Sequence, residues 1–592
     1  MGHLSRMHWT QTIDPFNNIA LSALVAIVPV LFIFWALLIK KMKGYQASLI
    51  AIAIAILIAV IVYRMPVKLA LLSTANGALY GLFPICWVVI TAVFLFNITV
   101  RSGQFEIIKH FMVSVTPDRR MQTLLIAFSF GAFLEGTAGF GAPVAITAAM
   151  LVAIGFNPLY ASGICLIANT APVAFGSIGI PITVASQVTS IPEMAISQMT
   201  GRTLPLLSLL LPLYLVTIVA GFKKAMEVLP AIIVCGISFA VLQWTTSNFV
   251  GPSLPDVIGG IGSILCLIIL LKWWKPKTVW KFPGEVAPMT DTAVNYSSSQ
   301  IVRAWSPFIL LTIMVIAWGL PPMKELLNAA GQVQFEFPGL HDVIIDKNGK
   351  ALPHIYKLNY LSASGTAILF AAIISIPLVG LSYREGLRIF MATLKQLRFA
   401  ILTIASVLAF AYIMNDSGIT ISIAQALTAT GLLFPFFAPM LGWLGVFITG
   451  SDTSSNALFG KLQASTANSL GIDPVVTVAA NVSGGVVGKM ISPSSIAVAA
   501  TAGDLAGKES LLFRFTVKHS FVMLAFICLI VMAQAYVFSW IIPAYQPATN
   551  NAITSVAVAA SGYTYLFALL ALLAVFSFSV LLANRKNKVL HN

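Results

Sequence analysis

Three ionisable side chains stand in otherwise apolar stretches, and their types define the chemistry that the chain can do. Glu135 and Asp452 are acids, and Lys489 is a base. A charge at the centre of a bilayer costs roughly 2.5–3.5 kcal/mol, so such groups must be paired, hydrated or neutralised. A carboxyl in apolar surroundings takes up a proton readily, which suits a reversible proton carrier. A lysine ammonium suits recognition of a carboxylate anion.

The residues around the two acids differ in kind. Gly131–Pro143, which contains Glu135, is rich in glycine and alanine, and these residues allow close backbone approach. Each acid also has a structural alternative to carrying a proton: Glu135 could cap the hairpin turn, and Asp452 could cap a helix N-terminus. Around Asp452 the chain offers oxygen atoms to a hydroxy acid or to Na⁺ through Ser451, Thr453, Ser454 and Asn456.

Lys489 follows a glycine in a segment whose Gly and Pro interrupt a helix. It is the predicted anchor for a substrate carboxylate, and a purely structural salt bridge to Glu135 or Asp452 is the alternative. Unpaired N–H groups at the start of a half-helix form a ready anion site. The remaining predicted substrate contacts belong to the interrupted helices and are Asn169, Thr170, Asn481 and Ser492.

The composition places these groups in a membrane. The chain has 592 residues, of which 58% are apolar and 9% are charged. Soluble domains carry about 25% charged residues, so the composition excludes a soluble enzyme, a nucleic-acid-binding protein and a disordered scaffold. The net charge of +15 fits the excess of basic residues on the cytoplasmic side of membrane proteins.

Apolar runs of roughly 20 residues are long enough to cross a bilayer. Two further stretches, 122–151 and 433–463, are interrupted by Gly, Ser, Thr and an acid. They predict re-entrant hairpins, because irregular backbone at membrane depth must be enclosed by protein or water. Thirteen transmembrane helices are expected near residues 19–39, 45–62, 79–99, 159–185, 204–222, 229–249, 256–271, 304–320, 359–380, 399–415, 474–500, 519–542 and 563–582.

The positions of the basic residues support this topology. With the N-terminus outside and the C-terminus cytoplasmic, 24 Lys and Arg lie inside and 8 outside, while Lys461 and Lys489 fall at membrane depth. The asymmetry requires each interrupted stretch to return to the side from which it starts, since counting either as one span inverts every later loop. The charge pattern therefore supports two hairpins.

The two halves of the chain repeat each other. The segments from Asn169 to Pro181 and from Asn481 to Pro493 both read N-x6-G-x4-P. Matching residues that keep nearly the same spacing in both halves of the chain predict an internal duplication. The other matching pairs are Ser102-Gly103 with Ser417-Gly418, the predicted hairpin tips Glu135-Gly136 with Thr449-Gly450, and Arg202 with Arg514.

The topology predicts two repeats of opposite orientation, as in secondary transporters whose substrate site lies near the midplane between repeats. The predicted fold class is an all-α polytopic membrane protein with broken helices. The first repeat spans 1–255 and contains the broken helix 159–185. A connector helix and a cytoplasmic loop take 256–303. The second repeat spans 304–592, with an external loop at 321–358 and the broken helix 474–500.

Other classes of function lack the residues that they need. No His falls in the middle of a predicted span and the five Cys show no metal spacing, so no metal, haem or other cofactor is expected. An intramembrane enzyme would need a nucleophile with a base, or a metal cluster, at membrane depth. No ATP-driving domain is visible in the sequence, so transport would run on an ion gradient.

Several long motifs resemble the bacterial lactate permease family. The resemblance covers about residues 9–543. It implies proton-coupled symport of L-lactate, D-lactate and glycolate, a fold related to ion transporters with paired hairpins, elevator-like movement, and a bacterial inner membrane. The motifs are Gly131–Ile146, Asn169–Gly176, Gly442–Phe459, Gly488–Pro493 and Lys508–His519.

The combined prediction is a secondary active transporter that moves a small carboxylate together with a proton across the lipid bilayer. Glu135 or Asp452 would carry the proton, and two half-helix ends with Lys489 would hold the carboxylate. A Na⁺-coupled carboxylate transporter is the alternative, favoured by the hydroxyl-rich second tip. No nucleic-acid partner is expected, and the sequence leaves open whether the chain forms a homo-oligomer.

Overall fold

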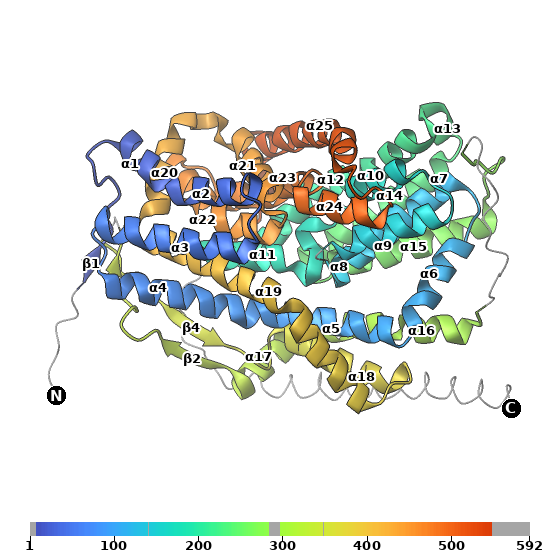
Figure 1. Cartoon of the computed structure of the whole chain (residues 1–592), viewed down its shortest axis with the longest axis horizontal. Helices are drawn as coiled ribbons and strands as arrows, with labels where there is room; N and C mark the ends of the chain where they lie inside the picture. Colours follow the sequence, from blue (N-terminus) through green and yellow to red (C-terminus); the bar gives the residue numbers. More distant parts are fainter. Residues whose placement is uncertain (1–7, 140, 283–295, 347–348, 547–592) are drawn as a thin grey trace.

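The chain folds into a bundle of long helices, seen in a computed structural model that describes residues 8–139, 141–282, 296–346 and 349–546 (Figure 1). Within these residues eleven helices are long and apolar enough to cross a membrane, or twelve if one bent pair forms a single span. The predicted polytopic α-helical fold is therefore confirmed. The predicted helix at 563–582 lies outside the described residues.

The elements before residue 283 are β1 Trp9–Thr10, α1 Ile19–Ala26, α2 Val28–Leu38, α3 Gly44–Ile61, α4 Val67–Tyr80, α5 Trp87–Arg101, α6 Gln104–Ser114, α7 Arg119–Gln122, α8 Gly131–Thr137, α9 Ala142–Ala153, α10 Pro158–Ala168, α11 Gly176–Thr189, α12 Glu193–Ala220, α13 Phe222–Met226, α14 Leu229–Phe249 and α15 Pro255–Trp273. Those after residue 295 are α16 Ser298–Gly319, α17 Pro321–Gly331, β2 Val333–Glu336, β3 Ile344–Ile345, β4 Ile355–Leu358, α18 Ser364–Leu378, α19 Tyr383–Asp416, α20 Ile419–Leu427, α21 Phe434–Thr449, α22 Asp452–Leu470, α23 Pro474–Lys489, α24 Pro493–Ala502 and α25 Glu509–Tyr536. Short π-helical turns are Gly81–Cys86 and Thr123–Phe130, and short 3-10 turns are Val173–Phe175, Thr428–Leu433 and Ser539–Ile541.

Several helices extend beyond the apolar runs that predict them. α4, the turn Gly81–Cys86 and α5 form one apolar span over Val67–Arg101, kinked at Phe83 (φ −140°, ψ 130°), where the sequence predicts 79–99. α19 begins at Tyr383 rather than near residue 399. The helical turns outside the predicted spans carry polar residues. Polar residues end the apolar run in the sequence, but the backbone hydrogen bonds of the helix continue through them. In contrast α18 has only 15 residues, so it is shorter than the predicted span 359–380.

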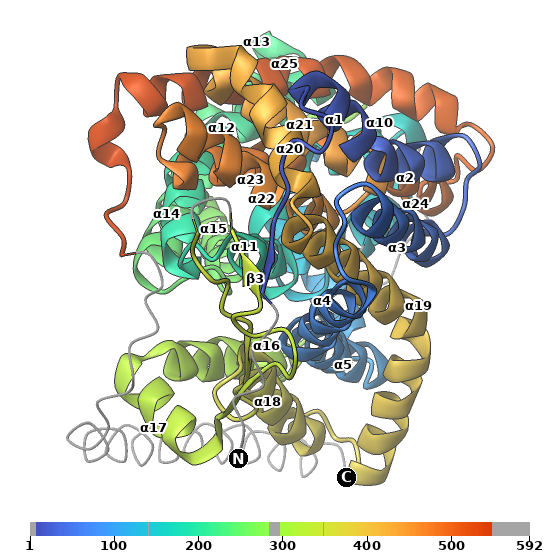
Figure 2. The same cartoon turned by 90° about the vertical axis from the view of Figure 1, so that its left-hand side faces the viewer.

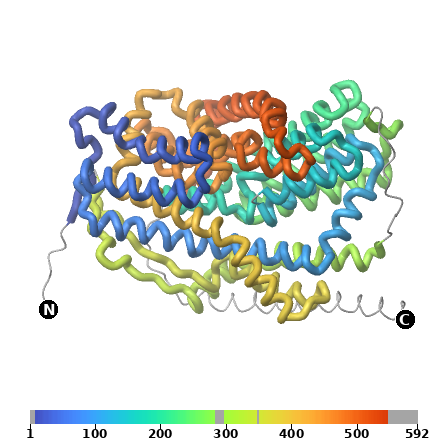
Figure 3. Tube along the Cα trace, viewed as in Figure 1, coloured from blue at the N-terminus to red at the C-terminus, as the bar shows by residue number. Residues whose placement is uncertain are grey.

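The helices divide into two packed groups. α3, α4 and α5 pack with α16, α18 and α19, so the first helices of the chain lie beside the start of the second half (Figure 3). The hairpins and broken helices pack instead with α12, α14, α15 and α25. α18 and α25 lie at opposite edges of the bundle in two perpendicular views (Figures 1 and 2).

The order of elements recurs in the two halves. α5 ends at Arg101 and α19 ends at Asp416, and in both places a Ser-Gly pair leads into the next helix. Gly103 and Gly418 have φ angles of 75° and 88°, in the left-handed region that glycine adopts without strain. These breaks lie at the Ser-Gly pairs that match between the two halves of the sequence.

Both predicted hairpins are helix pairs joined by glycine turns. α21 and α22 are joined at Gly450, where φ is 72° and where the sequence predicts the tip. The predicted first tip, Glu135-Gly136, is wrong, because α8 continues to Thr137 and the connection to α9 comes only after that residue. Gly136 remains helical because it packs against α15, where an added Cβ would lie 2.9 Å from the Cβ of Asp256.

Both N-x6-G-x4-P segments break their helices, as predicted. The chain bends by 62° between α10 and the segment that contains α11. At the start of α11, Ser177, Ile178 and Gly179 have left-handed φ angles of 48°, 60° and 76°. In the second half, α23 ends at Lys489 and α24 begins at Pro493.

Glycines allow α21 and α23 to pack backbone to backbone. An added Cβ at Gly442 would lie 1.9 Å from the carbonyl oxygen of Asn481, and one at Gly484 would lie 1.9 Å from that of Pro439. Small residues allow this close approach in membrane bundles. An apolar 18-residue stretch within Pro474–Ala502 is completely buried. Other parts of the protein therefore surround the segment that carries Lys489.

The predicted loop 321–358 has regular structure. It contains α17, and β2 pairs antiparallel with β4, with Val333 opposite Leu358. β3 pairs in parallel with β1, with Ile344 opposite Trp9. A polar sequence with a turn signal predicts an irregular connection, but pairing with a strand more than 300 residues away is a tertiary contact that local pattern does not reveal.

Candidate functional site

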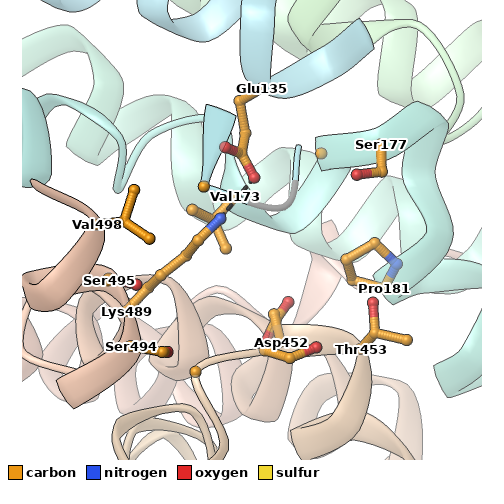
Figure 4. A pocket seen from close by; sticks show the side chains of 14 residues that line it. Glu135, Val173, Ser177, Pro181, Asp452, Thr453, Lys489, Ser494, Ser495 and Val498 are labelled. Atoms are coloured by element: carbon orange, nitrogen blue, oxygen red, sulfur yellow. Dashed lines mark hydrogen bonds and ion pairs between the residues drawn. The ribbon is translucent and has the colours of Figure 1, made fainter. Parts of the chain in front are cut away.

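A cavity of about 210 Å³ lies where the two hairpins meet the two broken helices (Figure 4). This volume is well above the roughly 10–15 Å³ that one water requires. Both halves of the chain contribute to its walls. The lining residues are Glu135, Gly141, Val173, Gly176, Ser177, Pro181, Gly450, Ser451, Asp452, Thr453, Lys489, Ser494, Ser495 and Val498.

Glu135 and Lys489 form a buried ion pair across this cavity. Lys489 Nζ lies 2.6 Å from Glu135 Oε1, and the side chains are 12% and 3% exposed. Glu135 comes from α8 of the first hairpin, whereas Lys489 is the last residue of α23. The pair therefore connects the first hairpin to the second broken helix.

The other oxygen of Glu135 is held by the first broken helix. Asn169, which follows α10, donates from Nδ2 to Glu135 Oε2 at 2.9 Å. Gly176 makes room for the carboxyl, because an added Cβ there would lie 2.7 Å from Oε1. Glu135 therefore does not cap the hairpin turn, and its carboxylate is paired on both oxygens.

Helix N-termini of both halves converge on the same cavity. α9 follows Gly141 and α11 starts at Gly176, and both glycines line it. α22 starts next to Ser451, which is its N-cap, and α24 exposes Ser494 and Ser495 in its first turn. Unpaired N–H groups and the helix dipole favour an anion at such ends. Together with Lys489, they make the cavity suitable for a carboxylate.

Asp452 also lines the cavity, but its surroundings differ from those of Glu135. It is the first residue of α22 and 4% exposed. Its Oδ2 accepts from Asn456 Nδ2 at 3.4 Å, and its buried Oδ1 has no hydrogen-bond partner among the described residues. Ser451 rather than Asp452 caps the helix, by accepting from the backbone N–H of Ser454 at 3.2 Å.

Six of the predicted site residues support the walls and are absent from the lining. Asn456 Nδ2 donates to the carbonyl oxygen of Pro181 at 3.1 Å, and Asn481 Nδ2 donates to Asn456 Oδ1 at 2.8 Å. These bonds tie α22 to the first broken helix and to α23. Asn169 holds Glu135, and Thr170 donates to the carbonyl oxygen of Ile167. The backbone N–H of Ser454 donates to the hydroxyl of Ser451, and Ser492 caps α24.

The sequence analysis missed several residues of the site. Ser177, Ser494 and Ser495 line the cavity. Ser177 directly follows Gly176, and Ser494 and Ser495 are the two residues after Pro493, so their place beside the helix-breaking Gly or Pro is a signal that could have identified them. Asp256, in the first turn of α15, is not among the lining residues, but it packs against Gly136 beside Glu135 and is fully buried with no hydrogen-bond partner for Oδ2 among the described residues. Nothing in its local sequence distinguishes this acid from a helix-capping residue.

The polar side-chain groups that line the cavity are oxygen and nitrogen atoms of Glu, Asp, Lys, Ser and Thr. Across the part of the chain that the structure describes, no three His, Cys, Asp or Glu side chains converge in the manner of a metal centre. The chemistry available in the cavity is therefore that of one ammonium, two carboxyls, several hydroxyls and helix N-termini.

A bundle of long apolar helices that encloses a charged cavity between paired hairpins and broken helices defines a polytopic membrane transporter. A sequence model described as L-lactate permease matches residues 22–538. The chain belongs to the L-lactate permease family.

Individual relatives match nearly the whole chain. It is 55% identical to an L-lactate permease of Bacillus subtilis, over 91% of this chain and 100% of that protein. It is 48% identical to the glycolate permease GlcA of Escherichia coli, over 90% of this chain and 99% of that protein. Among solved structures, the YdaH transporter of Alcanivorax borkumensis matches 79% of this chain and 88% of that chain with a TM-score of 0.44 at 12% identity.

Proposed function

We propose that the protein is a secondary active transporter that moves L-lactate, D-lactate and glycolate into the cell together with a proton. The observation that carries this proposal is the Lys489–Glu135 pair in a cavity that is otherwise suited to an anion. The names of the relatives, an L-lactate permease and a glycolate permease, support the choice of substrates. Both substrates are small 2-hydroxymonocarboxylates.

Competition for Lys489 would couple the anion to the proton. Without substrate, the Lys489 ammonium is paired with the Glu135 carboxylate. A substrate carboxylate that binds Lys489 displaces Glu135 and leaves a buried carboxylate without a counter-ion, which is costly. Protonation of Glu135 removes that cost, so the loaded site holds one anion and one added proton. Asn169 can still hold the protonated Glu135 by donating to its carbonyl oxygen.

The remaining cavity groups would orient the substrate. Ser451 before α22, Thr453 in α22 and Ser495 in α24 lie on the lining, where their hydroxyls can donate or accept. The N-terminal ends of α11 and α24 would add N–H donors to the carboxylate oxygens. Asn481 and Asn456 would act from behind by holding α22 against the first broken helix.

We also propose the membrane arrangement that the sequence predicts. The N-terminus would be outside and the C-terminus in the cytoplasm of a bacterium, with residues 1–255 and 304–592 as inverted repeats in the inner membrane. The recurring order of elements and the contribution of both halves to one cavity support this arrangement, which is the one found around midplane sites in secondary transporters.

Uptake of labelled lactate into proteoliposomes tests the proposal. A lactate anion with one proton is electroneutral, so a pH gradient should drive uptake and a potassium-diffusion potential alone should not. Unlabelled D-lactate and glycolate should compete. The hydroxyl-rich tip and the Oδ1 of Asp452, which has no partner in the described parts of the chain, favour Na⁺ coupling as the second candidate. Uptake driven by a Na⁺ gradient at equal pH would support that candidate and contradict proton coupling.

A further inference from the structure

The Asp452 carboxyl is a hydrogen-bond acceptor that the protein leaves largely unused. Among the described residues its Oδ1 is buried without a partner, and its Oδ2 has only the long 3.4 Å contact with Asn456. A buried acceptor without a donor loses the hydrogen bonds that water would give it, and this loss is larger for a charged group. Oδ1 lies against Gly485 of α23, but Asp452 lines the cavity, so rotation of the carboxyl lets a bound molecule supply the missing donor.

The position of Asp452 is set by two helices. As the first residue of α22, it lies at a helix N-terminus, which stabilises a negative charge. Gly485 of α23 makes room for the carboxyl, because an added Cβ there would lie 2.1 Å from Oδ1. Gly485 precedes Lys489 by one helical turn, so the two residues share one face of α23. Asp452 and Lys489 therefore reach the same cavity (Figure 4).

We propose that Asp452 accepts a hydrogen bond from the 2-hydroxyl group of the substrate and thereby selects 2-hydroxymonocarboxylates over 2-oxo and unsubstituted acids. This inference rests on the proposed function, in which Lys489 holds the carboxylate of the same molecule. It assigns Asp452 to specificity, whereas Glu135 takes the proton.

The chemistry of the acceptor explains the selection. The α22 N-terminus and the Lys489 ammonium in the same cavity favour the ionised form of Asp452. An ionised carboxylate can only accept hydrogen bonds, whereas hydroxyls such as those of Ser451 and Thr453 can donate or accept. A 2-hydroxyl group gives Asp452 its donor, but the carbonyl oxygen of pyruvate brings a second acceptor, and propionate brings none. Sites built around a substrate hydroxyl reject analogues that lack it strongly, because the polar group of the site is left unpaired.

Asp452→Asn tests this role, because the amide keeps the shape of the carboxyl but can donate to a carbonyl oxygen. The assay is counterflow of labelled L-lactate at equal pH on both sides, with unlabelled competitors outside. The preference for lactate over pyruvate should fall by about tenfold or more in this variant. Asp504→Asn is the control. Asp504 is exposed after α24 and has a left-handed φ of 57°, which Asn tolerates. The control variant should keep the wild-type preference for lactate over pyruvate.

The outcomes separate this inference from the proposed function. Counterflow needs no proton gradient, so it reports selectivity even if proton coupling fails. An Asp452→Asn variant that keeps the wild-type preference but loses accumulation under a pH gradient would contradict the inference and make Asp452 the proton carrier. If the variant does not insert into the membrane, competition in the wild-type protein tests the inference instead. Lactate and glycolate should inhibit counterflow of labelled L-lactate better than propionate, pyruvate and 3-hydroxypropionate. Equal inhibition by all five acids would overturn the inference.

Discussion

Lys489 Nζ lies 2.6 Å from Glu135 Oε1, and this contact joins a hairpin of the first half of the chain to a broken helix of the second. The two residues are 354 positions apart. A buried ion pair is weak evidence for a stabilising role, because desolvation offsets its attraction. Its position in the wall of a cavity lined by helix N-termini is the one that the proposed exchange of Glu135 for a substrate anion requires.

Glu135→Gln should separate exchange from accumulation. Glutamine keeps the hydrogen-bonding shape of a protonated glutamate but cannot release or bind the coupled proton. Counterflow of lactate should therefore persist, while uptake against a concentration gradient under a pH gradient should be lost. Glu106→Gln, which alters an exposed pair with Lys109, should accumulate lactate like the wild type. Normal accumulation by Glu135→Gln would rule out Glu135 as the proton carrier.

Lys489→Ala should weaken lactate binding by at least about tenfold, because a hydrogen bond to a charged group contributes roughly 1.5–3 kcal/mol. The apparent affinity in counterflow is the measurement. This variant leaves Glu135 buried without its cation, so the double variant with Glu135→Gln is measured as well, to separate anion binding from folding. Unchanged affinity in both would make Lys489 a purely structural residue.

Gly484→Ala should lower the thermal unfolding midpoint of the purified protein. The added Cβ would meet the carbonyl oxygen of Pro439 at 1.9 Å, so α21 and α23 must separate, and overpacking costs about 1–3 kcal/mol. Gly319→Ala is the matched control, since its Cβ has its nearest neighbour at 4.0 Å. Equal midpoints for the two variants would contradict the close packing of α21 on α23.

The segment 333–358 should be held more firmly at low pH through His354, which lies outside the membrane-spanning helices. Its Nε2 lies 3.1 Å from Asp416 Oδ2 and its Nδ1 lies 3.1 Å from the carbonyl oxygen of Leu352. Burial lowers the pKa of His354, but Asp416 and the carbonyl outweigh burial, so the net pKa is raised above 6.5. The stabilisation is then complete below that value and is lost as the pH rises through the raised pKa.

Hydrogen exchange of this segment tests the pH effect. Exchange, corrected for its intrinsic pH dependence, should be slower at about pH 6 than at about pH 9 in the wild type, because His354 changes its charge between these values. His354→Gln should remove the difference. A difference of the same size in the variant would show that another group controls the segment.

Most of the fold follows from the sequence because its determinants are local. Apolar length predicts the spans, and the Ser-Gly pairs before α6 and α20 and the Gly and Pro of the broken helices mark the breaks. The missed features depend on distant contacts. The first hairpin turn lies beyond Gly136 because that glycine packs against α15, and the strands of the segment 321–358 form by pairing that includes Trp9.

The candidate site is predictable in its charges but not in its geometry. Glu135, Asp452 and Lys489 stand out as charges in apolar stretches, and all three line the cavity. Which acid pairs with the lysine depends on how two halves of the chain meet, and no local pattern encodes this. Asn456 and Asn481 look like ligands from the sequence, yet they bond to each other, because the close packing of α22 and α23 brings them together.

Proton uptake on substrate binding tests the central claim most directly. If lactate displaces Glu135 from Lys489, the purified protein in weakly buffered solution should take up about one proton for each lactate bound, since binding and protonation are then linked. Glu135→Gln should still bind lactate but take up almost none. Lactate binding without proton uptake by the wild type, or equal uptake by the variant, would contradict the exchange of Glu135 for the substrate at Lys489.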